Sequence, residues 1–261
     1  MADIAVRTVD NFSRHRTGRN AAVVAHYSFL SVFPLMLVFT TVLGFLLESR
    51  PTWRKQIINS AFNRVPIIGQ QIGTDPAQIQ GSVFALVVGL TLTLWAGLRA
   101  FNALQTALDD VAEVPRDQRP NLLRTRVRSL GGIAVVGSAQ IAAAVLTGFV
   151  GVTGVRLLHK FLFAAAAVAI NTAALAAGYR WLCTQRSTWK QVAPGAVAAG
   201  VIFAGLQLTG TAIVGRAISN ATPVYGTFSS VIGLVTWMSL HSAVALLGAE
   251  MNRSLPLRRE D

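Results

Sequence analysis

The stretch that decides the fold is AAVVAHYSFLSVFPLMLVFTTVLGFLL, residues 21–47, which contains no Lys, Arg, Asp or Glu. A helix needs about 20 apolar residues to cross the hydrocarbon core of a bilayer, which is about 30 Å thick. The stretch is therefore predicted to be a membrane-spanning helix. Pro34 lies inside it and removes one helical hydrogen-bond donor, so we expect a kink there.

The composition of the whole chain agrees with this prediction. Hydrophobic residues make up 52% of the 261 residues and charged residues only 13%, whereas soluble domains are about a quarter charged. The single cysteine, Cys183, excludes a disulfide scaffold, and the apolar content excludes a disordered chain. A net charge of +12 on so apolar a chain indicates a membrane protein with basic loops, not a nucleic-acid-binding protein.

Five further apolar runs are long enough to be membrane spans. They are rich in Ala, Leu and Gly and lack the period-two alternation of membrane β-strands. The sequence predicts an all-α membrane protein: a single integral domain over residues 1–261 that is a six-transmembrane-helix bundle. The predicted spans are 21–47, 81–107, 131–155, 161–180, 192–215 and 224–250.

The distribution of basic residues predicts the orientation. Fifteen of the 23 Lys and Arg residues lie in the two termini and the loops 108–130 and 180–190, against seven in the other loops. The positive-inside rule then places both termini in the cytoplasm. In the first outer loop, 48–80, apolar residues at helical spacing predict an amphipathic helix, either in the outer interface or packed over the bundle. A surface helix is also predicted before residue 20, with an Asp10–Arg14 pair.

Several polar residues are predicted at similar, shallow depth in the inner leaflet. Ionisable groups within spans are functional candidates, because each is costly to keep in lipid. We expect a cluster in which Glu250 pairs with Arg99 or Arg180; the alternative is that each long side chain reaches the headgroups on its own. The candidate residues are His26, Tyr27, Arg99, Asn102, Arg180 and Glu250.

The last predicted span is rich in hydroxyl groups. Such a helix can line a water-filled transport path, or it can form hydrogen bonds with neighbouring helices. His241 is the deepest ionisable residue, and it is either a proton relay or a hydrogen-bonded packing residue. The candidate path-lining residues are Tyr225, Thr227, Ser230, Thr236 and His241.

Small residues predict where helices approach each other. In the third span Gly131 begins a four-residue ladder of small side chains, which favours close contact with a neighbour. In the fifth span glycines recur every five residues from Gly195, so they wind around the helix. We expect several neighbours to crowd that helix, or the helix to be locally flexible.

Motifs for enzymatic chemistry are absent from the sequence. It contains no nucleotide-binding glycine loop and no zinc-protease or serine-hydrolase motif, so no catalytic residue, metal site or cofactor is predicted. One stretch is acid-rich, but it lies among arginines, and we interpret it as solvated ion pairs. Its acidic residues are Asp109, Asp110, Glu113 and Asp117.

Four motifs, in order along residues 20–255, resemble the YihY/BrkB family. Residues 25–35 (AHYSFLSVFPL) resemble its first-span pattern, and the second motif runs from Leu94-Trp95-Ala96 to Arg99-Ala100-Phe101. The third runs from Trp189-Lys190 to Pro194-Gly195-Ala196, and the fourth from Tyr225-Gly226-Thr227 to Leu246-Leu247-Gly248-Ala249-Glu250. His26 departs from the pattern, which more often has alanine or another apolar residue before the tyrosine. The resemblance implies a six-span bacterial inner-membrane protein with cytoplasmic termini.

The resemblance implies several functions without fixing one. The family has carried a ribonuclease BN label and a virulence-factor label, and members have been linked to envelope lipid export. We expect transport or flipping of a lipid or envelope-related amphiphile without ATP hydrolysis; the alternative is a non-transporting scaffold for envelope integrity. A ribonuclease is least favoured, because clustered metal ligands are missing. Membrane lipids are the expected partners, with anionic headgroups at cytoplasmic arginines, and no specific nucleic acid.

Overall fold

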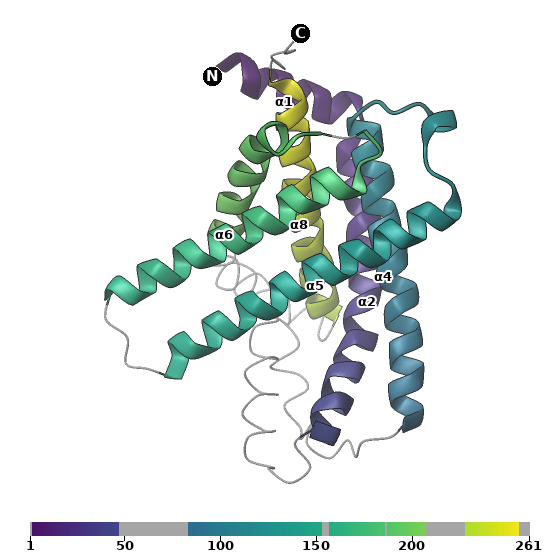
Figure 1. Ribbon diagram of the computed structural model, residues 1–261, viewed down its shortest axis with the longest axis vertical. Coiled ribbons are helices and arrows are strands. Elements are labelled where there is room, and N and C mark those ends of the chain that lie inside the picture. Colours follow the sequence, from purple (N-terminus) through teal and green to yellow (C-terminus); the bar gives the residue numbers. More distant parts are fainter. Residues whose placement is uncertain (1, 47–82, 153–156, 186, 207–227, 256–261) are drawn as a thin grey trace. The chain divides into compact units, whose positions relative to one another are not determined.

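The computed structural model of the chain describes residues 2–46, 83–152, 157–185, 187–206 and 228–255. All regular secondary structure in these residues is helical (Figure 1), so the predicted all-α class is confirmed. The elements are α1 (Ala2–Arg14), α2 (Thr17–Leu46), α4 (Val83–Val111), η2 (Arg116–Gln118), α5 (Leu122–Val152), α6 (Leu157–Leu182), a helix over Trp189–Leu206, and α8 (Phe228–Ser254). The amphipathic helix expected in 48–80 lies outside the described residues.

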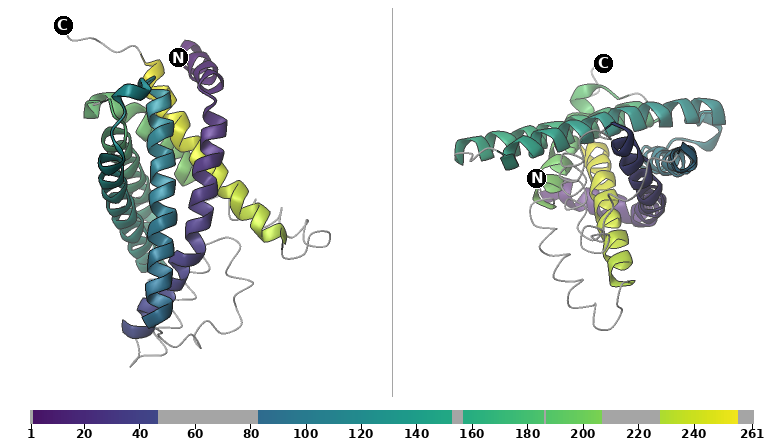
Figure 2. Two further views of the ribbon diagram at one scale, coloured as in Figure 1. Left: turned by 90° about the vertical axis from the view of Figure 1, so that its right-hand side faces the viewer. Right: turned by 90° about the horizontal axis from the view of Figure 1, so that it is seen from below.

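Four of the described helices are long and apolar enough to cross a membrane. They contain Thr17–Val38, Leu86–Val111, Trp189–Leu206 and Val231–Ser254. These segments fall on the first, second, fifth and sixth predicted spans. The third and fourth predicted spans fall on α5 and α6, which pack along each other (Figure 1 and Figure 2). The structure therefore supports a helical membrane protein, and the number of six membrane-spanning helices stays a prediction.

The chain divides into two compact units. Unit 1 comprises Met1–Ala25, Ala100–Leu208 and Ser239–Asp261, and unit 2 comprises His26–Arg99 and Thr209–Met238. Unit 1 therefore contains both ends of the chain, the beginning of α2, and the last parts of α4 and α8.

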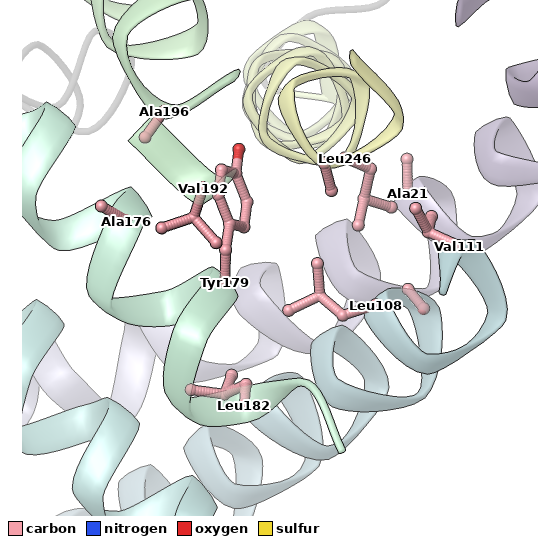
Figure 3. Close-up of a cluster of buried hydrophobic side chains, with 11 residues drawn as sticks. Ala21, Leu108, Val111, Ala176, Tyr179, Leu182, Val192, Ala196 and Leu246 are labelled. Carbon is pink, nitrogen blue, oxygen red and sulfur yellow. The ribbon is translucent and has the colours of Figure 1, made fainter. Parts of the chain in front are cut away.

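The core of unit 1 forms where five helix ends meet (Figure 3). It is built largely from alanines, with a few larger side chains such as Leu108, Tyr179 and Leu246 between them. Small side chains let helices approach closely, which is how helix association is stabilised where lipid gives little hydrophobic drive. The Tyr179 hydroxyl donates a hydrogen bond to the carbonyl of Ala245 over 2.5 Å and so joins α6 to α8.

The closest helix approach in this core depends on two glycines. A Cβ on Gly195 would overlap the carbonyl oxygen of Gly248, and a Cβ on Gly248 would lie 2.9 Å from Cβ of Ala199. A Cβ on Gly200 would instead meet Thr172 of α6, so glycines of this helix face different neighbours, as their spacing predicts. The prediction for Gly131 is wrong: a Cβ there would meet nothing within 4 Å, because no neighbouring helix covers that position.

Unit 2 contains the packing of α2 against α4. A Cβ on Gly89 would lie 3.2 Å from Leu37 and Val38, so the two helices approach closely there. Threonine hydroxyls bond back to the carbonyl four residues earlier, as Thr41 does to Leu37 over 2.7 Å, which keeps them satisfied without water. Large apolar side chains on the outer surface of this unit are exposed, among them Phe84 at 78%. Such exposure is typical of helices that face lipid.

Candidate functional site

The end of helix α8 carries a carboxylate that is fully buried, with Glu250 at 0% exposure. Thr17 Oγ1 donates a hydrogen bond to Glu250 Oε1 over 2.6 Å. His15 Nδ1 lies 3.0 Å from the same oxygen and 3.1 Å from Oε2. A buried ionised group is costly unless it is paired and hydrogen-bonded. The contacts with Thr17 and His15 provide that compensation for Glu250.

His15 connects this buried carboxylate to a second one. It lies in the break between α1 and α2, its side chain is 8% exposed, and its Nε2 lies 3.2 Å from Glu113 Oε1. Both ring nitrogens therefore face carboxylate oxygens. Arg14 Nη2 also lies 3.5 Å from Nε2, so this ring nitrogen has both a carboxylate and a guanidinium beside it. His15 thus links α8 to the turn that follows α4.

Glu113 completes the arrangement at the protein surface. It accepts hydrogen bonds from Arg14 Nη2 over 2.9 Å and from Arg253 Nη2 over 3.1 Å. The hydrogen bond from His15 lowers the pKa of Glu113 below the ordinary value of 4.5, and the hydrogen bond from Arg253 lowers it further. Glu113 is therefore ionised at neutral pH. We call His15, Thr17, Glu113 and Glu250, with Arg14 and Arg253, the polar layer.

Two turns of the polar layer have left-handed backbone at residues other than glycine. Arg16 has a φ of 53° and Glu113 a φ of 54°. Val114 N–H donates to the Asp109 carbonyl over 2.9 Å and Glu113 N–H to the Asp110 carbonyl over 3.1 Å, which is a Schellman end to α4. Left-handed backbone costs a residue with a side chain about 1–2 kcal/mol. Strain of this kind clusters at functional sites, which makes the polar layer the first place to look for function.

Two aspartates at the end of α4 attach further segments. Asp109 is 1% exposed and accepts hydrogen bonds from the backbone N–H and the hydroxyl of Thr184, over 2.7 and 2.8 Å. Asp110 accepts from Arg119 over 2.7 Å and from Asn20 over 3.0 Å. The interpretation of the acid-rich stretch as solvated ion pairs is wrong for Asp109, because α4 turns this residue into the core of unit 1.

Helix α1, which forms as predicted, is attached to α8. Asn11 Nδ2 donates to the hydroxyl of Ser254 over 3.2 Å, and Ser254 in turn donates to the Glu250 carbonyl over 2.9 Å. Arg14 donates to Asn11 Oδ1 over 3.2 Å as well as to Glu113. The predicted Asp10–Arg14 pair is therefore replaced by contacts that join α1 to other segments.

The predicted pairing of Glu250 with Arg180 is wrong. Arg180 Nη1 donates to the carbonyl of Ser187 over 2.9 Å, and its guanidinium lies 4.8 Å from the centre of the Trp189 ring. Both partners lie within nine residues of Arg180 in the chain. Arg180 therefore bonds within the adjoining turn, whereas the Glu250 carboxylate is bonded by His15 and Thr17.

The remaining residues of the predicted inner cluster make contacts with residues of their own helices. In unit 2, the guanidinium of Arg99 lies 5.5 Å from the ring of Trp95, and His26 contacts Tyr27 edge to face at 5.6 Å. Asn102, in unit 1, is exposed, and its carbonyl accepts a hydrogen bond from Thr106. Each of these contacts is formed within one helix.

The structure describes part of the predicted path-lining set. Thr236 is exposed on α8, and the ring of His241 lies edge-on to Phe203 at 4.8 Å. Ser230 lies in α8, but its side chain is outside the described part of the structure, as are Tyr225 and Thr227 entirely. A transport path along α8 therefore stays a prediction.

Two hollows adjoin the polar layer. One has a cavity volume of about 170 Å³; Leu108, Val111 and Tyr179 supply apolar lining, and Asn252 and Arg253 supply polar lining. The other, of about 380 Å³, is lined in part by Glu113, Gln118 and Arg253. The first therefore offers both apolar and polar contacts, as an amphiphile requires.

His15, Thr17 and Glu113 belong to this site, and the sequence analysis did not select them. His15 and Thr17 directly precede the first apolar run, and Glu113 follows the second apolar run. Their common signal is a polar residue placed immediately beyond the same end of a span as Glu250. That signal places residues at one depth but does not show which of them touch.

The chemistry available to the polar layer is proton exchange between carboxylates through an imidazole. An imidazole with a carboxylate at each nitrogen can take a proton on one side and release it on the other. In the part of the chain that the structure describes, no group of three or more His, Cys, Asp and Glu side chains could hold a metal ion. Glu113 and Glu250 contact different nitrogens of the imidazole, so the two carboxylates do not face a common point where they could bind one metal ion.

Comparison with known proteins identifies the family. No curated protein and no solved structure gives a match. The family model for virulence factor BrkB matches residues 8–261, nearly the whole chain. This match confirms the resemblance that the four sequence motifs predict, and the family is not a known enzyme family. The chain belongs to the virulence factor BrkB family.

Proposed function

We propose that this protein moves an amphiphile with an anionic headgroup across the bacterial inner membrane without ATP hydrolysis, with both termini in the cytoplasm. The observation that carries the proposal is Glu250, a fully buried carboxylate at the end of a candidate span, bonded to His15 and Thr17. Ionisable groups are rare in such helices and usually serve an ion or substrate pathway. The cavity beside them combines apolar and polar lining, as the two ends of an amphiphile require.

The polar layer suits a proton-dependent cycle. His15 contacts Glu250 on one side and the partly exposed Glu113 on the other, so a chain of ionisable groups runs from the core of unit 1 to its surface. Movement of a proton between the two ring nitrogens would change which carboxylate the imidazole can donate to. The strained turns at Arg16 and Glu113 adjoin this link, so a change at His15 would act on the ends of α1 and α4.

A non-transporting scaffold is the second candidate, and one observation favours it. Glu250, Glu113 and Asp109 each have two or more hydrogen-bonding or ionic contacts. A network with this many contacts is sufficient to hold the helix ends in place without any part in transport. Such a scaffold would depend on these residues for stability and would show no movement of lipid.

Reconstitution separates the two candidates. Purified protein is placed in liposomes that contain fluorescent phosphatidylglycerol, and flipping is measured, without nucleotide, as the fraction bleached by external dithionite. We expect lipid movement well above that of empty liposomes, and a rate at least tenfold lower for Glu250→Gln. Asp117→Asn, which removes a charge from an exposed residue, should flip at the wild-type rate.

Movement equal to that of protein-free liposomes would overturn the transport proposal and favour the scaffold. The thermal unfolding of Glu250→Gln in detergent is measured alongside. If the variant remains folded and flips lipid at the wild-type rate, Glu250 is not part of the transport machinery.

A further inference from the structure

A third hollow in unit 1 has a different lining from those beside the polar layer. Its volume is about 380 Å³, and it lies between the start of α5 and the turn after α6. At about 30 Å³ of liquid volume per water molecule, this is room for a hydrated phosphate group. We call it the arginine pocket; its lining residues are Arg128, Gly131, Arg180, Trp181, Cys183 and Ser187.

The two arginines of the pocket have spare hydrogen-bonding capacity. A guanidinium has five N–H donors. Arg180 gives one nitrogen to the Ser187 carbonyl, and the Trp189 ring orients its guanidinium plane. Nη1 of Arg128 is buried and has no hydrogen-bond partner among the described residues. A buried donor without a partner is costly, and a bound acceptor would remove that cost.

The lining contains no carboxylate to balance the two positive charges. The nearby Asp109 is already bonded to Thr184 through both of its oxygens. Burial raises the pKa of Cys183 to about 11, so its thiol adds no negative charge at neutral pH. Gly131 lies one turn after Arg128 on α5, and a Cβ there would meet nothing within 4 Å, so the wall beside the arginine stays open.

We propose that the arginine pocket binds a phosphate group, which Arg128 and Arg180 hold through charge-assisted hydrogen bonds. Guanidinium groups match the oxygens of a phosphate in pairs, and such bonds are about twice as strong as neutral ones. Trp181, half exposed at 51%, lies at the rim, and indoles favour the headgroup level of a membrane. The phosphate belongs either to a lipid headgroup or to a soluble phosphate ester.

The lipid form of this inference rests on the proposed function, because it names the headgroup of the amphiphile that would be moved. Binding is therefore measured in detergent, apart from transport. Native mass spectrometry of the purified full chain is titrated with short-chain phosphatidylglycerol, with short-chain diacylglycerol as a probe that lacks phosphate, and with inorganic phosphate. The variants are Arg128→Gln, Arg180→Gln and the matched control Arg126→Gln, an exposed arginine of the same helix.

We expect phosphatidylglycerol to bind more tightly than diacylglycerol, about tenfold weaker binding for each pocket variant, and less than a threefold change for Arg126→Gln. Phosphatidylglycerol binding that depends on both arginines, with no binding of inorganic phosphate, supports a lipid headgroup. Inorganic phosphate that binds in the same arginine-dependent way supports a soluble phosphate ester.

Equal losses in all three variants would overturn the site, because they would show only attraction to a basic surface. Unchanged binding in Arg128→Gln and Arg180→Gln would overturn it as well. A chain that binds phosphatidylglycerol through both arginines but moves no lipid in liposomes keeps the site and refutes the transport function. A chain that moves lipid equally well without these arginines keeps the transport function and refutes the assignment of the pocket to the headgroup of the transported lipid.

Discussion

The polar layer and the arginine pocket belong to the same unit, but their charges are arranged in opposite ways. In the polar layer the carboxylates of Glu113 and Glu250 meet cationic or hydroxyl partners within 3.2 Å. In the arginine pocket Arg128 and Arg180 lie together without a carboxylate in the lining. A saturated cluster holds structure and can pass protons, whereas a cluster of like charges leaves capacity for a ligand. Stability should therefore respond to changes in the first region, and ligand affinity to changes in the second.

The largest effect is expected from Glu250→Ala. The substitution removes the hydrogen-bond acceptor of His15 and Thr17 in a fully buried position, and leaving buried donors without an acceptor costs about 3 kcal/mol of unfolding free energy. Arg128→Gln, in the arginine pocket, removes one of two neighbouring positive charges and should leave the stability unchanged or slightly higher. Thermal unfolding in one detergent measures both. A Glu250→Ala protein as stable as wild type would remove the contrast between the regions.

The same glycine-to-alanine substitution should have opposite effects in the helix core of unit 1 and in the arginine pocket. Gly248→Ala places a methyl group against Tyr179, Gly195 and Ala199, and we expect a loss of about 2 kcal/mol, as in other overpacked cores. Gly131→Ala meets no neighbour, so it should stabilise α5 by up to about 1 kcal/mol, since alanine favours helix over glycine.

The same pair of variants also separates stability from binding. Gly131→Ala adds a methyl group to the wall of the arginine pocket and so reduces the space for a ligand. It should therefore weaken phosphatidylglycerol binding while the protein becomes more stable. If Gly248→Ala leaves the unfolding temperature unchanged, the helix packing around Gly195 and Gly248 is not as close as the structure indicates.

Sequence reasoning went further for the fold than for the site, and the physical reason is one of range. An uncharged run such as 21–47 must be helical in lipid whatever surrounds it, so α2 is visible in composition alone. The contact between His15 and Glu250 joins residues far apart in the chain, and it depends on the left-handed turn at Arg16 that sets the direction of α1. Composition carries no information about that turn.

Local composition also gave the wrong environment for individual charges. Asp109 and Glu113 lie in one acid-rich stretch, yet α4 turns the first into the core and its last turn leaves the second at the surface. Membrane depth favours a contact of Glu250 with Arg99 or Arg180, because all three are expected at one depth. Depth was the only constraint available, and it could not reveal that the carbonyl of Ser187 and the ring of Trp189 are within reach in the adjoining turn.

A smaller effect is expected at Glu113, where strain and ion pairing oppose each other. Glu113→Gly removes the contact with His15 and the ion pairs with Arg14 and Arg253, each worth under about 1 kcal/mol at this exposure, but relieves left-handed strain of about 1 kcal/mol. The two changes should nearly cancel in the free energy of unfolding. Glu113→Gln keeps the strain and loses the charge, so it should be the less stable variant. The reverse order would show that the turn at Glu113 is not strained.

The smallest effect is expected from pH, again through Glu113. The folded state lowers the pKa of this carboxyl below 4.5, chiefly through the hydrogen bond from His15. Its stabilising contribution is therefore fully present above about pH 4.5 and is lost as the pH falls through the lower folded-state pKa. The difference in unfolding temperature between wild type and Glu113→Gln, measured in one detergent, should be constant from pH 7 to pH 5 and shrink below pH 4.5. Because Glu113 is 45% exposed, the difference should also shrink in high salt. A difference that is the same at pH 7 and pH 3 would mean that the Glu113 charge contributes nothing, and the polar layer would then rest on the buried contacts of Glu250 alone.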